Sequence, residues 1–171
     1  GLHARLQAQF GELNLEGAAR CGDQIVLLQR GNGAKAQNGL ALLDRVRFEA
    51  GLARGVLDGS ELTRATLVEL PRLEGVPLGF TDAAPLGATE VAFIAAAEDS
   101  ASTYDDGACM GSVIGRLSLD GKVSALEPVD GKDKLEGLWV APGAQGGLQV
   151  WVVSDNDDPA QPAWLRSGLW R

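Results

Sequence analysis

The feature that most constrains this chain is a pattern of short apolar segments that returns three times along its length. The first round begins with Leu15-Glu16-Gly17 and the third with Leu135-Glu136-Gly137. These two motifs lie about 120 residues apart, so one round takes about 60 residues. Repetition at a fixed period is typical of proteins in which similar units stack on one another. The sequence therefore predicts a repeat architecture.

The segments inside each round read as β-strands. They are short, rich in apolar residues, and separated by turn-forming pairs such as Gly22-Asp23 and Asp120-Gly121. An Ala-rich run, Ala95-Ala96-Ala97, also fits a helix, but its flanks lack a convincing pair of caps. A further strand is expected at Leu2–Phe10, without an obvious partner. The strands expected in the three rounds are Leu13–Arg20, Ile25–Arg30, Leu40–Phe48 and Thr63–Leu70; Gly79–Ala84, Val91–Glu98, Ser112–Leu119 and Lys122–Val129; and Leu135–Val140, Leu148–Val153 and Ala163–Trp170.

Antiparallel units of four strands that repeat in this way predict an all-β fold of the β-propeller type. The whole chain would form one propeller segment, with blades at about residues 13–70, 78–129 and 134–171, the last one incomplete. Propellers need about four to eight blades to close a ring. The chain is therefore expected to be the C-terminal half of a six-bladed protein, or to pair with a second copy in which each Leu2–Phe10 strand completes the other's last blade.

Charge and residue usage exclude several classes of function. The net charge is -8, without a block rich in Lys and Arg, which argues against nucleic acid as a partner. No stretch is apolar and long enough to suggest a membrane span. His3 is the only histidine, so a Ser-His-Asp or Cys-His mechanism and a histidine-ligated zinc site are not expected. Cys21 and Cys109 fit either a disulfide or two free thiols.

Ionisable residues recur where the first strand of a round begins and where the second ends. In a propeller both positions lie at one mouth of the central channel. Glu16, Glu98, Glu136 and Asp155 are therefore candidate metal ligands, and an all-oxygen set of this kind suits Ca²⁺ or Mg²⁺. Two simpler interpretations remain open. Glu16 and Glu136 fit an ion pair with Arg30, and Asp155 fits a solvated Asx turn.

A second group of residues is a candidate for binding an anionic ligand. Arg30 with Asn32 fits a clamp for a phosphate or carboxylate, although a simple salt bridge of Arg30 is the preferred interpretation. Asp82 opens the second round. Tyr104 and Asp105 lie in the long polar segment 100–109, and long loops at a propeller mouth commonly shape binding sites.

The repeated Leu-Glu-Gly elements, together with the strand endings Ala97-Glu98 and Ser154-Asp155, resemble bacterial β-propellers of the phytase-like, esterase-like and SdiA-regulated group. The resemblance implies a six-bladed propeller whose acidic channel mouth often holds calcium. Two positions depart from the pattern, because Thr81-Asp82 replaces Glu-Gly and Gln29-Arg30 replaces an acidic ending. These departures weaken the case for phosphate hydrolysis, which needs a dense array of carboxylates and calcium.

Three functions are expected from these patterns. The leading one is a propeller module that binds a cation, and through it a small anionic ligand, at the channel mouth. The second is a calcium-assisted phosphoester or ester hydrolase in which Glu16, Glu98, Glu136 and Asp155 hold the metal. The third is a structural platform for protein interactions. The expected cofactor is Ca²⁺, and the expected macromolecular partner is the missing half of the ring or a second copy.

Overall fold

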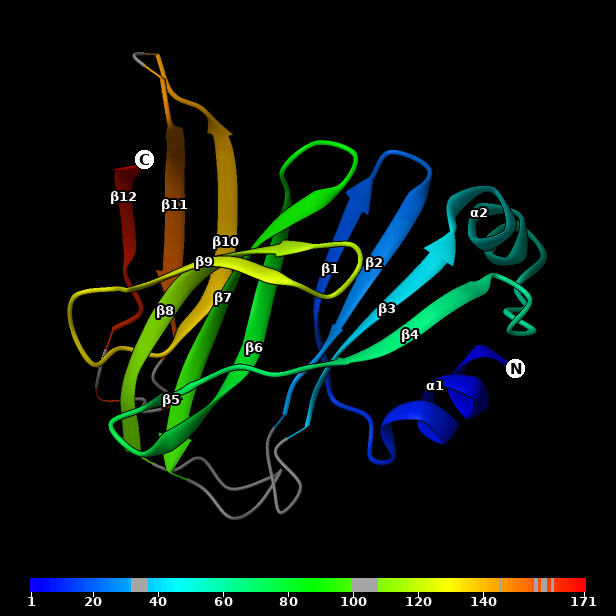
Figure 1. Ribbon diagram of the computed structural model, residues 1–171, viewed down its shortest axis with the longest axis horizontal. Helices are drawn as coiled ribbons and strands as arrows, with labels where there is room; N and C mark the ends of the chain where they lie inside the picture. The colour runs from blue at the N-terminus through cyan, green and yellow to red at the C-terminus, as the bar shows by residue number, and fades with distance from the viewer. Residues whose placement is uncertain (32–36, 100–107, 145, 156, 158–159, 161) are drawn as a thin grey trace.

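The computed structural model describes the chain except residues 32–36, 100–107, 145, 156, 158–159 and 161 (Figure 1). In the described part, the strands form three antiparallel sheets accompanied by two short helices. The all-β class predicted from the sequence is confirmed. Sheet 1 holds β1 (Leu15–Cys21), β2 (Gln24–Gln29), β3 (Asn38–Asp44) and β4 (Leu62–Val68); sheet 2 holds β5 (Arg72–Leu73), β6 (Val76–Pro85), β7 (Glu90–Asp99), β8 (Ala108–Ser118) and β9 (Val123–Pro128); sheet 3 holds β10 (Leu135–Pro142), β11 (Leu148–Ser154) and β12 (Leu165–Trp170).

Each sheet is a meander in which strands adjacent in sequence are also adjacent in space. The first long strands of the three sheets, β1, β6 and β10, lie beside one another, with β6 between the other two (Figure 1). β1 and β6 approach closely, because a Cβ added to Gly17 would lie 3.2 Å from the backbone nitrogen of Ala83. These three neighbouring strands bring the start of every sheet into one region of the molecule.

The Ala-rich segment of β7 is explained by its position between two apolar layers. Side chains of a strand alternate between its two faces. Phe93 and Ala95 point toward sheet 1, and Ala92 and Ile94 toward sheet 3. All four are fully buried. The strand prediction for this segment is therefore confirmed, and small side chains let both neighbouring sheets pack against it.

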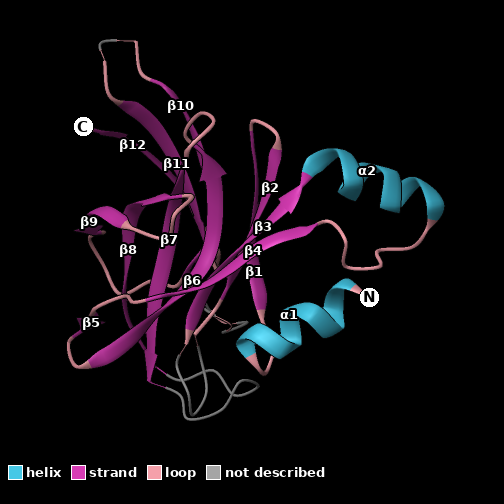
Figure 2. Cartoon of the chain, turned by 45° about the vertical axis from the view of Figure 1, so that its right-hand side comes forward, coloured by secondary structure: helices cyan, strands magenta, loops and turns pink. Residues whose placement is uncertain are grey.

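Leu2–Phe10 is a helix, α1, so the prediction of a strand there is wrong (Figure 2). Leu2, Leu6 and Phe10 are four residues apart, which places them on one face of a helix. That face is buried against Ala41 and Leu43 of β3. The same three residues also fit the alternation of a strand, which is why the sequence pattern misled. Since α1 covers the outer face of sheet 1, this segment offers no extended strand for exchange with a second copy.

The strand predicted to run to Phe48 ends at Asp44, and α2 (Arg45–Arg54) comes directly after it. The side chain of Asp44 accepts a hydrogen bond from the Arg47 amide at 2.8 Å and caps the helix. Gly55 ends it in the left-handed conformation with φ of 70°. The two-residue strand β5 was also not predicted. The other predicted strands are present, with ends that differ by a few residues.

The four tryptophans, all in the third round of the sequence pattern, differ in environment. Trp170 is buried between sheets 2 and 3, and Trp164 packs at the edge of the same layer. Trp139 and Trp151 lie edge to face on the other side of sheet 3, with ring centroids 4.5 Å apart. Trp139 is 56% exposed. Packing between sheets is thus the role of Trp170 and Trp164 only.

Candidate functional site: a buried cluster of carboxylates and two cations

β1, β6 and β10, the three neighbouring strands that we call the inner strands, each contain a β-bulge at an equivalent position. The register of pairing shifts between Leu15 and Gly17 in β1, between Phe80 and Asp82 in β6, and between Leu135 and Gly137 in β10. Glu16, Thr81 and Glu136 are the residues at these bulges. A bulge bends the strand and redirects a side chain. The sequence pattern indicated that these positions are equivalent, and the structure has a β-bulge at each of them.

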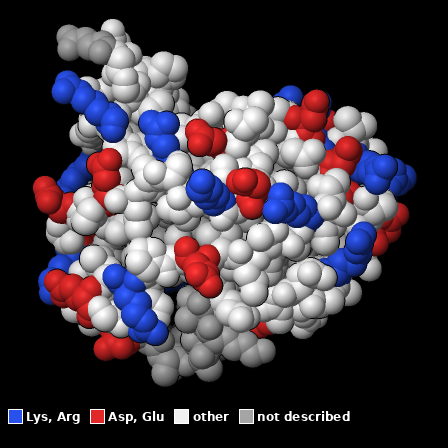
Figure 3. Space-filling model, in the orientation of Figure 1, with Lys and Arg blue, Asp and Glu red and all other residues white. Residues whose placement is uncertain are grey.

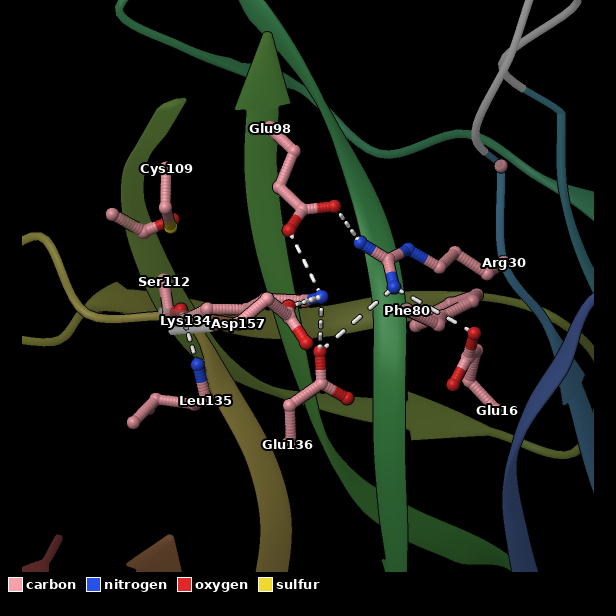
Figure 4. Close-up of polar contacts among 12 residues, drawn as sticks. Glu16, Arg30, Phe80, Glu98, Cys109, Ser112, Lys134, Leu135, Glu136 and Asp157 are labelled. Atoms are coloured by element: carbon pink, nitrogen blue, oxygen red, sulfur yellow. Dashed lines mark hydrogen bonds and ion pairs between the residues drawn. The ribbon is translucent and has the colours of Figure 1, made fainter. Parts of the chain in front are cut away.

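Arg30 directly succeeds β2 and lies at the centre of several carboxylates (Figure 4). Its side chain is 6% exposed and forms a hydrogen-bonded ion pair with Glu98 from the end of β7. Nη1 lies 3.6 Å from Glu16 and 3.9 Å from Glu136. The backbone amide of Arg30 donates to the Asn14 carbonyl, which fixes the residue at the start of sheet 1.

Lys134, which directly precedes β10, supplies a second buried cation (Figure 4). Its Nζ atom lies 3.1 Å from Glu98, 3.1 Å from Glu136 and 2.6 Å from Asp157. Burial alone would lower the pKa of Lys134, because it disfavours the charged form. The hydrogen bond to Asp157 and the charges of Glu136 and Glu98 outweigh burial and raise that pKa above its ordinary value. Lys134 therefore carries a full positive charge.

Arg30, Lys134 and the four carboxylates that contact them form what we call the charged cluster. Its carboxylates outnumber its cations. Three sheets contribute to it. Parts of it reach solvent, since the side chains of Glu16 and Glu136 are 26% and 24% exposed. Elsewhere on the molecule acidic and basic side chains are interspersed on the face seen in Figure 3. The members of the charged cluster are Glu16, Arg30, Glu98, Lys134, Glu136 and Asp157.

Glu136 contacts both cations of the cluster through the same oxygen atom, Oε1. Its buried Oε1 atom has no hydrogen-bond partner, although Lys134 Nζ lies 3.1 Å away as an ion-pair partner. Burial raises the pKa of Glu136, while Lys134 and Arg30 oppose that rise and the negative charge of Glu16 adds to it. A further positive charge near Glu136 would stabilise its ionised form.

Three of the four predicted metal ligands meet in the cluster, namely Glu16, Glu98 and Glu136. Asp155 does not. It is exposed, and its Oδ1 atom accepts a hydrogen bond from the Asp157 amide at 3.1 Å, which is the Asx turn considered from the sequence. That turn lies before Asp157, whose carboxylate contacts Lys134 in place of Asp155.

The structure does not bring the predicted ligand-binding residues together in one site. Arg30 forms ion pairs with carboxylates, which is the simpler of the two interpretations drawn from the sequence. Asp82 joins two sheets, because its Oδ2 atom accepts a hydrogen bond from the Leu138 amide at 2.7 Å. Burial raises the pKa of Asp82, and backbone hydrogen bonds from Leu138 and Ala83 counteract the rise. The candidates Asn32, Tyr104 and Asp105 lie outside the described residues.

The arrangement of the cluster is that of an internal ion-pair network. Among the described residues, no group of three or more His, Cys, Asp or Glu side chains is positioned to hold a metal ion. The physical reason is that Arg30 and Lys134 lie between the carboxylates that were expected to converge on a metal. Sequence reasoning missed the cationic role of Lys134, although its position directly before Leu135-Glu136-Gly137 was visible.

Two buried polar side chains hold the sheets in place around the cluster. Asn38 accepts hydrogen bonds from the amides of Gly31 and Phe80 and donates to the Leu78 carbonyl at 2.7 Å, which connects sheet 1 to sheet 2. Ser112 on β8 donates to the Asp133 carbonyl at 2.9 Å and accepts from the Leu135 amide at 3.1 Å. These contacts fix the segments that carry Arg30 and Lys134.

The two cysteines are free thiols, so the disulfide alternative is wrong. Cys21 is fully buried at the end of β1, and burial raises its pKa. Cys109 lies at the start of β8, where burial is again the main cause of a raised pKa. A raised pKa keeps both thiols protonated and weakly nucleophilic at neutral pH.

Fold and site together define a protein of three packed antiparallel sheets with a buried charged cluster where their inner strands begin. The chain belongs to a family of unknown function (DUF6910), whose model matches residues 1–159. The match covers the charged cluster and ends before β12. Comparison with curated proteins and with solved structures gave no match. Neither helix in the described part of the chain is long and apolar enough to cross a membrane.

Proposed function

We propose that the three sheets are blades of a β-propeller and that the charged cluster binds a cation at the mouth of its channel. Support for the blades comes from the shared meander order and from the neighbouring inner strands β1, β6 and β10. Equivalent bulges at Glu16, Thr81 and Glu136 further support three related units.

The observation that carries the cation proposal is the buried Oε1 atom of Glu136, which makes ion pairs with Lys134 and Arg30 but no hydrogen bond, within an excess of carboxylates. A buried carboxylate oxygen that accepts no hydrogen bond costs free energy, and a bound cation would recover part of it. Glu136 and Glu16 are both partly exposed, so an ion from solvent can reach them. Binding at these two residues would offset the negative charge that Arg30 and Lys134 leave unbalanced.

The ligand types favour a hard cation such as Ca²⁺. All candidate donors are oxygens, which Ca²⁺ prefers and accepts at about 2.3–2.6 Å. Thr81 adds a neutral oxygen, because its buried Oγ1 atom has no hydrogen-bond partner and the residue stands at the bulge equivalent to Glu16 and Glu136. Arg30, in contrast, already faces three carboxylates, so an anionic ligand would have to compete with all of them.

Thermal unfolding with Ca²⁺, with Mg²⁺ and with EDTA tests this proposal. A ligand that binds only the folded state at 100 times its Kd adds about 2.7 kcal/mol of stability. We expect Ca²⁺ to raise Tm in the native chain and to have a reduced effect in Glu16→Gln. The matched control is Glu49→Gln, which changes an exposed carboxylate on α2 and should leave the response to Ca²⁺ intact.

One result would contradict the cation site, and another would change the function assigned to it. A Tm that neither metal ion nor EDTA changes would exclude a cation site of useful affinity. Calcium-dependent hydrolysis of a generic phosphoester, lost in Glu136→Gln, would instead favour the hydrolase considered from the sequence.

A further inference from the structure

A pocket of about 280 Å³ opens between sheets 2 and 3, away from the charged cluster. It is formed by the turn between β6 and β7, the end of β10 and the start of β11, which lie at the top of Figure 1. On β10, Val140 at the pocket is four residues beyond Glu136 of the charged cluster, or about 13 Å along the strand. The two sites share no residue.

Most of the pocket wall is apolar. Leu86, Val140 and Leu148 line it, and all three pack against the apolar layer between sheets 2 and 3 while remaining partly accessible. Pro142 extends this wall at the end of β10. Pockets for drug-sized ligands have volumes of about 300–1,000 Å³. This pocket is slightly smaller, which suits a ligand with a few apolar carbon atoms.

Arg116 of β8 lines the pocket from the side of sheet 2. Its guanidinium carbon lies 5.0 Å from the centroid of the Trp170 ring, and this cation–π contact orients the side chain. The guanidinium makes no hydrogen bond or ion pair with another residue in the described part of the chain. Its N–H donors therefore remain available for a carboxylate, which an arginine binds through two parallel hydrogen bonds.

Glu90, at the start of β7, supplies a negative charge to the same pocket. Ala92 lies opposite Arg116 in the β7–β8 pairing, and Glu90 is two residues before Ala92. Glu90 and Arg116 are thus diagonal neighbours on the face of sheet 2 that looks toward sheet 3. They form no ion pair with each other or, among the residues that the structure describes, with any other side chain.

We propose that this pocket binds a free α-amino acid with an apolar side chain. The α-carboxylate of the ligand accepts hydrogen bonds from Arg116, its α-ammonium group pairs with Glu90, and its side chain packs against Val140 and Leu148. An acid without the ammonium group would leave Glu90 close to a second negative charge. An amine without the carboxylate would be repelled by Arg116. The pair of charges therefore selects a zwitterion.

The pocket does not depend on an unpaired strand. Its lining residues lie between Pro85 and Leu148, inside the sequence, and the strands that carry them are all paired with neighbours in the described chain. β10 pairs with β11 on one side and lies beside β6 on the other. The site is therefore built from elements that the structure already contains.

Titration calorimetry of the full chain with L-leucine, L-valine and L-phenylalanine tests the proposal. We expect saturable binding of at least one of these amino acids. For L-leucine, three analogues separate the contributions of its groups: isocaproic acid lacks the ammonium group, isopentylamine lacks the carboxylate, and glycine lacks the side chain. Each analogue should bind at least about tenfold more weakly than the amino acid.

Variants of the two charged residues test the roles given to them. Arg116→Lys keeps the positive charge but removes the paired donors, and Glu90→Gln removes the negative charge at almost unchanged shape. Each should weaken amino-acid binding at least about tenfold, and Glu90→Gln should also lose the preference for L-leucine over isocaproic acid. Arg20→Lys and Glu127→Gln change exposed residues elsewhere and are the matched controls. Thermal unfolding without ligand verifies that all four variants are folded.

Three outcomes would overturn the proposal. They are absence of binding for all three amino acids, equal affinities for L-leucine and isocaproic acid, and unchanged affinity in both Arg116→Lys and Glu90→Gln. Glu136→Gln, which changes the charged cluster, should leave amino-acid binding intact, so the result does not depend on the proposed cation site.

Discussion

Glu98 Oε1 lies 3.1 Å from Lys134 Nζ, so a residue at the end of β7 contacts one directly before β10. The other oxygen of Glu98 accepts the hydrogen bond from Arg30. One buried carboxylate thus contacts both cations of the cluster and ties all three sheets together. Glu98, at 10% exposure, is the most buried carboxylate of the cluster, and the two contacts compensate the cost of burying its charge.

Replacement of Glu98 by Gln should destabilise the fold. The substitution removes the charge that faces both Arg30 and Lys134, and breaking a buried ion pair costs about 3 kcal/mol or more. Urea unfolding at pH 7 measures the change in unfolding free energy. Glu49→Gln on α2 is the control, since its pair with Arg45 is exposed and should contribute less than about 1 kcal/mol. Equal effects in the two variants would show that the cluster is not a stabilising network.

Glu136→Gln, unlike Glu98→Gln, should not destabilise the fold. The pKa of Glu136 is raised in the folded state, mainly by burial, so its ionised form is less favourable there than in the unfolded chain. We expect the unfolding free energy at pH 7 to stay within about 0.5 kcal/mol of the native value or to exceed it.

The pH dependence gives a second measurement for the same variant. Because the folded pKa is above the ordinary value, the native chain gains stability from this group as pH falls through the folded pKa, until the carboxyl is also protonated in the unfolded state. Glu136→Gln should lack that gain. A clear loss of stability in Glu136→Gln at pH 7 would show that attraction to Lys134 outweighs burial.

Lys134→Met should unfold more easily at neutral pH. Removal of the ammonium leaves Glu98, Glu136 and Asp157 without the cation that they share. A fully uncompensated buried charge costs about 3–5 kcal/mol, and the loss should lie at or below the lower end of this range because Arg30 still contacts Glu98 and Glu136. The loss should shrink at pH 4, where carboxylates begin to take up protons. Urea titrations at the two pH values measure it. Lys132→Met, which changes an exposed lysine 4.0 Å from Glu74, should have little effect at either pH.

The fold could be predicted from the sequence where the alternation of apolar residues had only one explanation. Most strands fall in this group, since short apolar segments bounded by Gly and Asp rarely fit a helix. Leu2, Leu6 and Phe10 fit both periods, and only the tertiary contact with β3 selects the helix. For α2 the caps Asp44 and Gly55 were visible, but the apolar segment before them suggested that the strand continued.

The sequence predicted the carboxylates of the candidate site but not the cations that they contact. The repeated motif identifies Glu16 and Glu136 as equivalent, and equivalence under a repeat places them close together. Whether such carboxylates meet a metal or a side-chain cation depends on residues remote in sequence. Lys134 and Arg30 come from different sheets, and their approach to Glu98 is set by sheet packing that no local pattern records.

Asp82→Ala should weaken the contact between sheets 2 and 3. The Leu138 amide would lose the acceptor that now lies 2.7 Å away, and an unsatisfied buried donor costs about 1–3 kcal/mol. Asp82→Asn keeps an oxygen that can accept the same hydrogen bond, so its effect should be smaller. Chemical denaturation of both variants measures the change in unfolding free energy. Unchanged stability in Asp82→Ala would contradict the structural role.

Leu6→Ala tests whether α1 is an integral part of the fold. Leu6 is 2% exposed and packs between the helix and β3. Loss of a buried leucine side chain costs about 2–5 kcal/mol, because both the transfer free energy and the remaining cavity count against the folded state. Gln7→Ala, on the exposed side of the same helix, should change the unfolding free energy by less than about 0.5 kcal/mol. If Leu6→Ala proved equally silent, α1 would not cover sheet 1 in solution, and the outer face of that sheet would be free for a partner.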